Sequence, residues 1–122
     1  MSYMVLWIDS KHAKLFSFTK QGVEKSEMEM TKHEQHVAEA DKNHGECREF
    51  YDRVAKALQN PEELLVVGPG NAKKHFKTEL DSHHKNLAQK VVAVENMDHP
   101  TDGQIVDHAK RFFRKHDIFN AL

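Results

Sequence analysis

The stretch ELLVVGPGNAKKHFKTEL, residues 63–80, decides the fold of this chain. It opens with four consecutive apolar residues (64–67), a run that is typical of a strand buried on both faces near the centre of a sheet. Gly-Pro-Gly (68–70) ends that strand, because glycine permits a sharp turn and proline cannot continue the strand pairing. Asn71 is a good N-cap, so we expect a helix from about Ala72. The stretch therefore predicts a central strand that turns directly into a helix.

The start of this helix is basic. Its free backbone N–H groups, together with Lys73, Lys74 and Lys77, would favour a bound anion such as phosphate. A solvated basic face beside a tight connection is the structural alternative, and this stretch alone does not separate the two.

Composition indicates one soluble domain covering residues 1–122. The chain is 39% hydrophobic and 30% charged, as in globular proteins with a heavily charged surface. Its 18 Lys and Arg residues balance 19 Asp and Glu residues, so any nucleic-acid-binding surface must be local. The single cysteine, Cys47, cannot form an internal disulfide. No apolar run approaches the ~20 residues that span a bilayer. We therefore expect a cytoplasmic protein without a membrane association.

Hydrophobic periodicity predicts eight elements in the order strand, strand, strand, helix, strand, helix, strand, helix. The expected strands cover residues 4–8, 13–19, 23–31, 64–67 and 90–96, and the expected helices cover 46–60, about 72–82 and about 101–119. Thr101 and Gln104 form a capping-box pattern at the start of the last helix. This order predicts an α/β fold: a mixed five-stranded sheet, an antiparallel meander followed by parallel βαβ units, with helices packed on it, ribonuclease-H-like. The two apolar strands and the first strand should form its parallel centre.

Two segments before the first helix carry less apolar character. The strand 23–31 alternates, with Met28 and Met30 facing one way and Glu27 and Glu29 the other, which is typical of an edge strand. Residues 32–45, KHEQHVAEADKNHG, have no apolar face and are predicted to form a long polar loop. Loops of that length in compact domains are often functional.

Four segments resemble one known family. IDSKHAKLFSF (8–18) looks like the first hairpin of the central domain of archaeal and eukaryotic peptide-release factors and of the ribosome-rescue protein Pelota. ECREFYDRVAKAL (46–58) is similar to the helix after that domain's long loop, and LLVVGPGNAKKHF (64–76) to its strand-to-helix junction. VVAVEN (91–96) follows in the expected place. The resemblance covers about nine tenths of the chain, judged by the order of elements.

The resemblance implies a role at the ribosome or on RNA, because the central domain of that family enters the large ribosomal subunit. In release factors the loop before the first helix carries Gly-Gly-Gln, whose glutamine helps water to attack the peptidyl-tRNA ester. Here the corresponding segment contains Gln35 without the preceding glycines. The sequence therefore looks like a stand-alone, bacterial-type version of the domain that lacks the motif, and its function is predicted to be non-catalytic. An ester hydrolase that uses Gln35 and loop histidines to position water is an alternative.

Histidine and cysteine spacing suggests a further hypothesis for the same segment. His33, His36, His44 and Cys47 have a spacing that would allow a tetrahedral zinc site, which would order the polar loop. In a chain with ten histidines such spacings also arise by chance, so solvated histidines are the preferred interpretation.

Acidic residues at strand ends suggest a second enzymatic alternative, a metal-dependent nuclease. Asp9 ends the first strand and Glu95 ends the last, with Asp107 as a more distant candidate for binding Mg²⁺. Asp9 is explained equally well as a turn residue and Glu95 as a strand terminus.

Basic residues carry the functional prediction that we favour. Backbone phosphates require only positive charge and N–H donors, so basic clusters suffice for sequence-independent contact with rRNA, tRNA or the whole ribosome. The residues predicted to contact RNA are Lys32, Gln35, Lys42, Lys73, Lys74 and Lys77. A protein-interaction module, with a homodimer through the Met28 and Met30 edge strand, is a third alternative. No nucleotide or dinucleotide fingerprint is present, so no cofactor is expected.

Overall fold

The computed structural model of the chain describes residues 2–40 and 46–120. The strands are β1 (Tyr3–Ile8), β2 (His12–Thr19), β3 (Gly22–Glu29), β4 (Glu63–Gly68) and β5 (Val91–Asn96). The helices are α1 (Lys32–Ala40), α2 (Arg48–Ala57), α3 (Ala72–His83), α4 (Lys85–Ala88) and α5 (Asp102–Asn120). Within the described residues, no helix combines the length and the apolar character that crossing a membrane requires.

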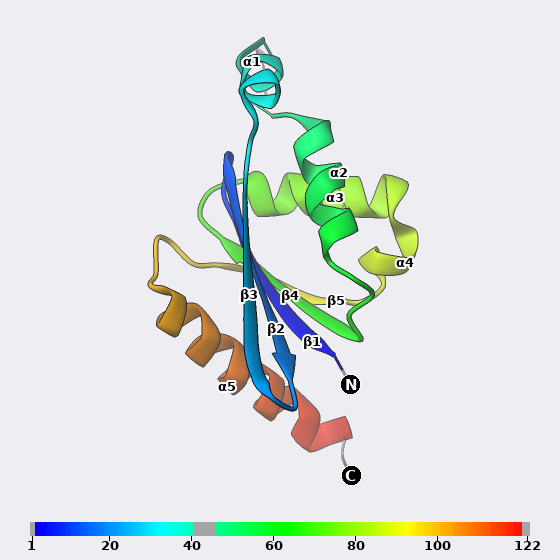
Figure 1. The fold of residues 1–122 in the computed structure, drawn as a ribbon. Helices are drawn as coiled ribbons and strands as arrows, with labels where there is room; N and C mark the ends of the chain where they lie inside the picture. Colours follow the sequence, from blue (N-terminus) through cyan, green and yellow to red (C-terminus); the bar gives the residue numbers. More distant parts are fainter. Residues whose placement is uncertain (1, 41–45, 121–122) are drawn as a thin grey trace.

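The five strands form one mixed sheet in the order β3-β2-β1-β4-β5 (Figure 1). β2 pairs antiparallel with both β1 and β3, whereas β4 pairs parallel with both β1 and β5. The predicted α/β class, an antiparallel meander continued by parallel strands, is confirmed. The prediction that β4 lies inside the sheet is also confirmed.

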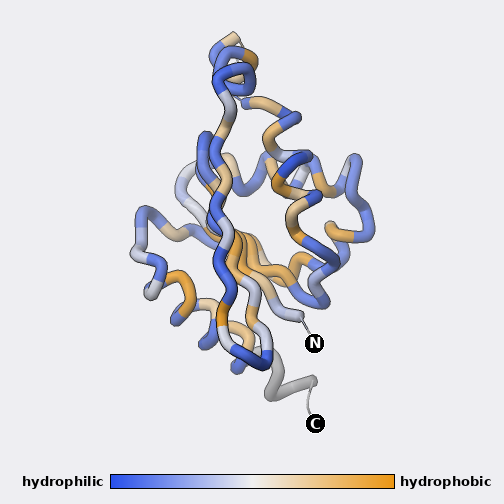
Figure 2. The backbone as a smooth tube through the Cα atoms, viewed as in Figure 1, coloured by the Kyte–Doolittle hydropathy of each residue, from blue (hydrophilic) through white to orange (hydrophobic). Residues whose placement is uncertain are grey.

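Apolar side chains on the two faces of the sheet form two separate clusters. α5 covers one face with Ile105, Ala109 and Phe113, while α2 and α3 cover the other with residues such as Phe50 and Phe76. The tube in Figure 2 shows hydrophobic strands in the middle of the molecule, whereas the exposed strand β3 is largely hydrophilic. The sheet is therefore the middle layer between helices.

β5 lies at an edge of the sheet, so the prediction that it belongs to the parallel centre is wrong. Its Val91 and Val94 pack on the α2–α3 side, and Val92 and Ala93 pack on the α5 side. An apolar run reports burial on both faces of a strand, and helices supply that burial at an edge as well as in the centre. Residues 91–94 remain only half-buried as a result.

The predicted polar loop at 32–45 is also corrected, because its first nine residues form the helix α1. The helix begins with a capping box in which the Thr31 N–H donates to Glu34 Oε1 at 2.9 Å and the Glu34 N–H donates to Thr31 Oγ1 at 3.1 Å. Glu34 and Ala38 are its buried residues. Polar contacts thus stabilise this helix, which lacks the apolar stripe that would have predicted it from the sequence. Residues 41–45 lie outside the described residues.

The Gly-Pro-Gly junction turns as predicted. Gly70 has φ 57°, a left-handed conformation that favours glycine. Gly68 is required by close approach, since a Cβ built there would lie 2.1 Å from the carbonyl oxygen of Ile8. Asn71 occupies the N-cap position of α3, but its side chain makes no capping hydrogen bond. The junction therefore fixes the end of β4 against the end of β1.

Other sequence expectations hold in detail. Met28 and Met30 face the same cluster, and β3 is an edge strand. At the start of α5, the Thr101 N–H donates to Gln104 Oε1 at 2.9 Å, and the Gln104 N–H donates to Thr101 Oγ1 at 3.2 Å. This capping box is the one that the sequence predicted. Helix ends differ by a few residues, and α2 is shorter than the predicted 46–60.

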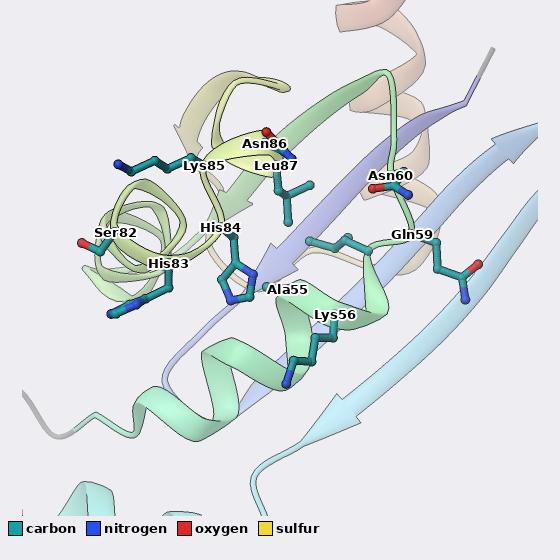
Figure 3. Close-up of a pocket in the computed structure, with 11 residues that line it drawn as sticks. Ala55, Lys56, Gln59, Asn60, Ser82, His83, His84, Lys85, Asn86 and Leu87 are labelled. Atoms are coloured by element: carbon teal, nitrogen blue, oxygen red, sulfur yellow. The ribbon is translucent and has the colours of Figure 1, made fainter.

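A polar cleft of about 650 Å³ opens on the α2–α3 side of the molecule. It lies between the last turn of α2 and the corner at which α3 meets α4 (Figure 3). The segments around it lead into the amino ends of β4 and β5. The cleft therefore lies at the end of the sheet where β4 and β5 begin, and the Gly-Pro-Gly junction lies at the other end, where β4 terminates.

Candidate nucleic-acid interface

Most of the predicted site residues lie at one end of the sheet, where four of its strands terminate. We call this end the carboxyl edge. β3 is antiparallel to β2, and β2 is antiparallel to β1, so β3 runs in the same direction as β1. Because β4 and β5 are parallel to β1, the strands β1, β3, β4 and β5 all terminate at this end. The β1–β2 turn, the start of α1, the β4–α3 junction and the β5–α5 connection meet there. Figure 1 shows α1 beyond this edge, at the far end of the molecule from the chain termini. Open α/β sheets bind ligands outside the carboxyl ends of their strands.

An ion pair between α1 and α2 holds α1 in place. Arg53 of α2 donates from Nε to Glu34 Oε2 at 2.9 Å and from Nη2 to Glu34 Oε1 at 2.7 Å. Its Nη2 also donates to the Glu29 carbonyl oxygen at 2.8 Å. The hydrogen bond from Arg53 lowers the pKa of Glu34 below its usual range and outweighs the opposing effect of burial. Arg53 thus joins α1, α2 and the end of β3.

Gln35 lies inside α1 and is half-buried. Its Nε2 donates to the Met30 carbonyl oxygen at 3.3 Å. The side chain is therefore turned back toward the end of β3, and its backbone has the regular hydrogen bonding of a helix. A glutamine held in this way differs from one on a glycine-rich loop that approaches an ester.

The three lysines predicted at the start of α3 have different environments. Lys73 is 2% exposed, and its ammonium donates to the Gly70 carbonyl oxygen. Burial lowers the pKa of Lys73, and the charge of Lys74 lowers it further. Lys77 contacts the Asp81 carboxylate at 2.5 Å. Only Lys74 is exposed, and within the described residues it has no ion-pair partner.

Three exposed lysines, which we call the carboxyl-edge lysines, lie where the four strands end: Lys11, Lys32 and Lys74. Lys11 is in the β1–β2 turn, Lys32 opens α1 and Lys74 is in the first turn of α3. None of the three forms an ion pair in the part of the chain that the structure describes. Lys42, also predicted to contact RNA, lies outside the described residues. Lys11 was not predicted, although its position in a turn beside Asp9 could have indicated it.

The described members of the zinc hypothesis have other neighbours. His33 Nε2 lies 3.7 Å from Glu49 Oε2, His36 is exposed, and Cys47 is 1% exposed beneath the start of α2. His44 lies outside the described residues. Among the residues that the structure describes, no group of three or more His, Cys, Asp or Glu side chains is placed to hold a metal ion.

The carboxylates of the nuclease hypothesis each have a local partner. Asp9 Oδ1 accepts hydrogen bonds from the backbone N–H groups of Lys11 at 2.9 Å and His12 at 2.6 Å. Glu95 Oε1 lies 2.8 Å from His108 Nε2. Asp107 contacts Arg111 at 2.7 Å on the exposed face of α5. These contacts are those of a turn, a strand end and a helix surface.

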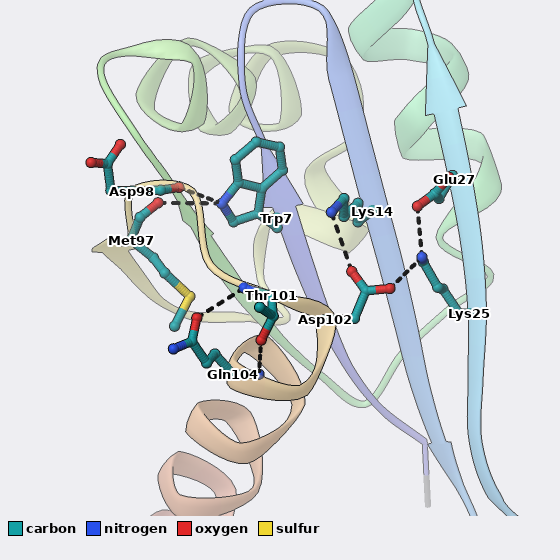
Figure 4. Close-up of polar contacts among 9 residues, drawn as sticks. All are labelled: Trp7, Lys14, Lys25, Glu27, Met97, Asp98, Thr101, Asp102 and Gln104. Atoms are coloured by element: carbon teal, nitrogen blue, oxygen red, sulfur yellow. Dashed lines mark hydrogen bonds and ion pairs between the residues drawn. The ribbon is translucent and has the colours of Figure 1, made fainter.

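The single tryptophan positions the β5–α5 connection at the same edge (Figure 4). The Trp7 indole N–H lies 3.2 Å from the Met97 carbonyl oxygen and 2.9 Å from the Asp98 carbonyl oxygen. On the same side, Asp102 at the start of α5 accepts a hydrogen bond from Lys14 at 3.2 Å and pairs with Lys25. These contacts tie the start of α5 to β2 and β3 and tie the connection before it to β1, so this end of the sheet has fixed connections around it.

Comparisons with known proteins give matches at the level of structure. No protein-family model matches the sequence, and no curated protein matches it. Pelota of Archaeoglobus fulgidus superimposes with a TM-score of 0.65 at 24% identity, over 90% of this chain and 31% of that one. The archaeal translation termination factor aRF1 gives a TM-score of 0.62 at 16% identity, over 89% of this chain and 34% of that one. Dom34 of S. cerevisiae, a translation termination-like factor, gives a TM-score of 0.60 at 12% identity, over 87% of this chain and 31% of that one.

These matches confirm, for the fold, the resemblance that the sequence indicated. Nearly the whole chain corresponds to a part of each of these proteins. The chain spans about a third of the length of the solved structures that it matches.

Proposed function

We propose that this protein binds the ribosome or structured RNA, in a role related to translation termination and rescue, and that it acts in the cytoplasm without catalysing a reaction. The shared fold supports the proposal, because Pelota, aRF1 and Dom34 are three proteins with the same architecture over nine tenths of this chain. Dom34 is described as a factor in RNA quality control pathways. At these identities the fold is shared, and the role is our inference.

The observation that carries the proposal is the arrangement at the carboxyl edge of the sheet. Lys11, Lys32 and Lys74 are exposed there. The helix α1, which Lys32 opens, extends beyond the ends of the strands (Figure 1). Phosphate groups of RNA are bound by cations of this kind without regard to sequence. Arg53 and Glu34 keep α1 in one orientation, so α1 can act as a rigid probe that enters a groove in a larger particle.

The state of Gln35 supports a non-catalytic role. The residue is held in α1 with its amide bonded to the Met30 carbonyl oxygen, and the described helix contains no glycine. A catalytic amide must be placed within hydrogen-bond reach of the reacting ester. We therefore assign Gln35 to contact with RNA or with its own strand end, and not to peptide release.

Sedimentation of cell lysate through a sucrose gradient at low salt tests the proposal. We expect the protein to migrate with a ribosomal subunit or with whole ribosomes, and to leave that fraction as salt rises, because phosphate contacts release bound counterions. Migration only at the top of the gradient in low salt would contradict the proposal.

Matched charge reversals identify the surface. Replacing both Lys32 and Lys74 by Glu should abolish co-migration at a salt concentration where the natural protein still binds. Lys20→Glu is the control, since Lys20 is an exposed lysine in the β2–β3 turn at the opposite end of the sheet. Equal loss of binding in the control and in the double variant would show that only overall charge matters. Lys73→Met should leave binding unchanged, because the Lys73 ammonium is buried.

A further inference from the structure

The outer face of α5 is a strongly charged surface that the proposed function does not use. α5 lies on one side of the sheet, and α2, α3 and α4 lie on the other (Figure 1). Ile105, Ala109 and Phe113 of α5 turn toward the sheet and are buried. Four cations on its outer side are exposed, and we call them the α5 basic stripe: Lys110, Arg111, Arg114 and Lys115.

The stripe has an excess of positive charge within its own helix. Between Asp107 and Asp117 the sequence has these four cations and no carboxylate. Asp107 contacts Arg111 at 2.7 Å. The other three cations of the stripe form no ion pair in the part of the chain that the structure describes. The stripe is therefore positive even after its ion pair with Asp107 is counted.

The arrangement opposes the stability of the helix. Side chains four positions apart are neighbours on a helix surface, and like charges at that spacing repel each other. Lys110 and Arg114 form one such pair, and Arg111 and Lys115 form a second. Cations favour the carboxyl end of a helix only within its last turn, whereas Lys110 and Arg111 lie at least about two and a half turns before Asn120. Helix stability therefore does not account for the stripe, and a bound anion would relieve the repulsion.

The stripe has no apolar component. In the described part of α5 the large apolar residues are buried or half-buried against the sheet: Ile105, Val106, Phe112 and Phe113. A helix that lies on a membrane places an apolar face in the lipid, and a protein interface is centred on apolar or aromatic anchors. The exposed face of α5 offers neither. Its partner is therefore one that charge alone can hold.

The phosphate backbone of RNA is such a partner. Lysine and arginine side chains bind it by releasing condensed counterions, and no apolar contact is needed. Arg111 and Arg114 add planar guanidinium groups, which can donate two hydrogen bonds to one phosphate. Cations four positions apart are separated by about 6 Å along the helix axis, so the stripe can contact several phosphates at once.

We propose that the α5 basic stripe is a second RNA-binding surface, which holds the backbone phosphates of a structured RNA without reading its sequence. The class of ligand rests on the proposed function, and the location goes beyond it. α5 runs from the carboxyl edge toward the chain termini, so Lys110 lies about 12 Å and Lys115 about 20 Å along the helix from Asp102 (Figure 1). The stripe is therefore separate from the carboxyl-edge lysines, and one molecule can hold two RNA segments at once.

Titration of the ¹⁵N-labelled protein with a short RNA hairpin at low salt, followed by NMR, tests the proposal. We expect saturable shifts of the backbone amide signals of residues 110–115, with a Kd of about 100 µM or tighter. The shifts should reverse as salt rises. The Lys32→Glu, Lys74→Glu double variant should keep the shifts in α5, so a failure here and a failure of ribosome binding can be told apart.

Matched substitutions make the test specific. Lys110→Gln with Arg114→Gln should raise the Kd about tenfold or more and reduce the slope of log K against log salt by about 2, about one for each cation removed. This variant should unfold at the same or a higher temperature than the natural protein, because glutamine has a similar helix propensity and one like-charge pair is removed. Lys56→Gln with Lys85→Gln, two exposed lysines of α2 and α4, makes the same change in net charge on the other side of the sheet and should change the Kd by no more than about twofold.

The proposal is overturned if the RNA hairpin causes no saturable shift in residues 110–115, or if the α2 and α4 control weakens binding as much as the stripe variant does. It is also overturned if polyglutamate or phosphatidylserine vesicles bind the stripe as tightly as the hairpin does, since an acidic protein or a membrane would then be the partner. A clearly lower unfolding temperature in the stripe variant would mean that the four cations serve the helix and not a ligand.

Discussion

The guanidinium of Arg53 forms two hydrogen bonds with the carboxylate of Glu34, at 2.9 and 2.7 Å, between helices that flank the undescribed residues 41–45. The carboxylate side chain is only 4% exposed, whereas that of Arg53 is 40% exposed. The pair is therefore a buried anion held by a partly solvated cation. Removing this ion pair should therefore destabilise α1 more than it destabilises the rest of the fold.

Arg53→Met should destabilise the protein by about 1 to 3 kcal/mol, because it leaves the Glu34 carboxylate buried without its partner. Urea unfolding followed by Trp7 fluorescence measures this change. Lys56→Met, in the same helix, breaks the exposed pair with Asp52 and should cost no more than about 0.5 kcal/mol. Hydrogen exchange in α1 should accelerate only in the Arg53 variant. Unchanged exchange there would mean that Arg53 does not hold α1.

Acid sensitivity should also involve Glu34. Its pKa in the folded protein is lowered from 4.5, chiefly by the hydrogen bond from Arg53. In the window between the lowered pKa and 4.5 the unfolded chain binds more protons, so this contribution to stability is complete above about pH 5 and is lost as pH falls through the folded pKa. Glu34→Gln should flatten the loss of stability between about pH 5 and pH 3. The loss should persist in part, since hydrogen bonds from lysines also lower the pKa values of Asp52 and Asp102. An identical slope in the variant would contradict this assignment.

Gly68 and Gly103 offer the same substitution in opposite environments. Gly68→Ala should destabilise by about 2 to 4 kcal/mol, because the new Cβ would lie 2.1 Å from the Ile8 carbonyl oxygen and the strands would have to separate. Gly103→Ala, where the nearest atom is Thr101 Oγ1 at 3.9 Å, should be neutral or stabilise by up to about 1 kcal/mol, since alanine favours a helix. Thermal unfolding of both variants gives the comparison. Equal changes in thermal stability would show that the backbone at the β1–β4 contact can shift to accommodate the added methyl group.

The buried ammonium of Lys73 should give stability an alkaline dependence. Burial lowers its pKa from 10.5, so between the lowered value and 10.5 the unfolded chain binds more protons. Stability should therefore rise with pH in that window through this group. Lys73→Met replaces the charge by an apolar chain of similar length and should remove the rise while leaving the protein at least as stable at pH 7. Unfolding free energies between pH 7 and pH 10 measure it. A large loss of stability in the methionine variant would mean that the bond to the Gly70 carbonyl oxygen outweighs the cost of burial.

Sequence patterns were sufficient to predict the strands of the sheet and their apolar faces. The apolar run at 64–67, the alternation in β2 and the Gly-Pro-Gly turn each depend on local rules, and these rules predict elements and faces. The position of β5 could not be read in the same way. Whether a strand with two apolar faces has one neighbour or two is decided by pairing with distant residues, and periodicity contains no information on that.

The candidate interface was only partly predictable. The pattern Thr31-x-x-Glu34 predicts a helix start by the same rule that identified Thr101 and Gln104, and it was the available signal for α1. The ion pair with Arg53 links residues 19 positions apart in the chain, so no local pattern reveals it. Likewise, Lys73 and Lys74 are equivalent in a sequence count of charges, and only the packing of α3 on the sheet buries one and exposes the other.

The apolar clusters on the two faces of the sheet share no side chain. A substitution on one face therefore leaves the packing on the other intact, and double variants such as one at Phe50 and one at Phe113 should have additive effects on stability. Each face can accept new side chains independently, provided that the strand pairing between them persists. Such independence lets sequences diverge far while the architecture stays the same, which is the relation seen between this chain and structures 12% to 24% identical to it.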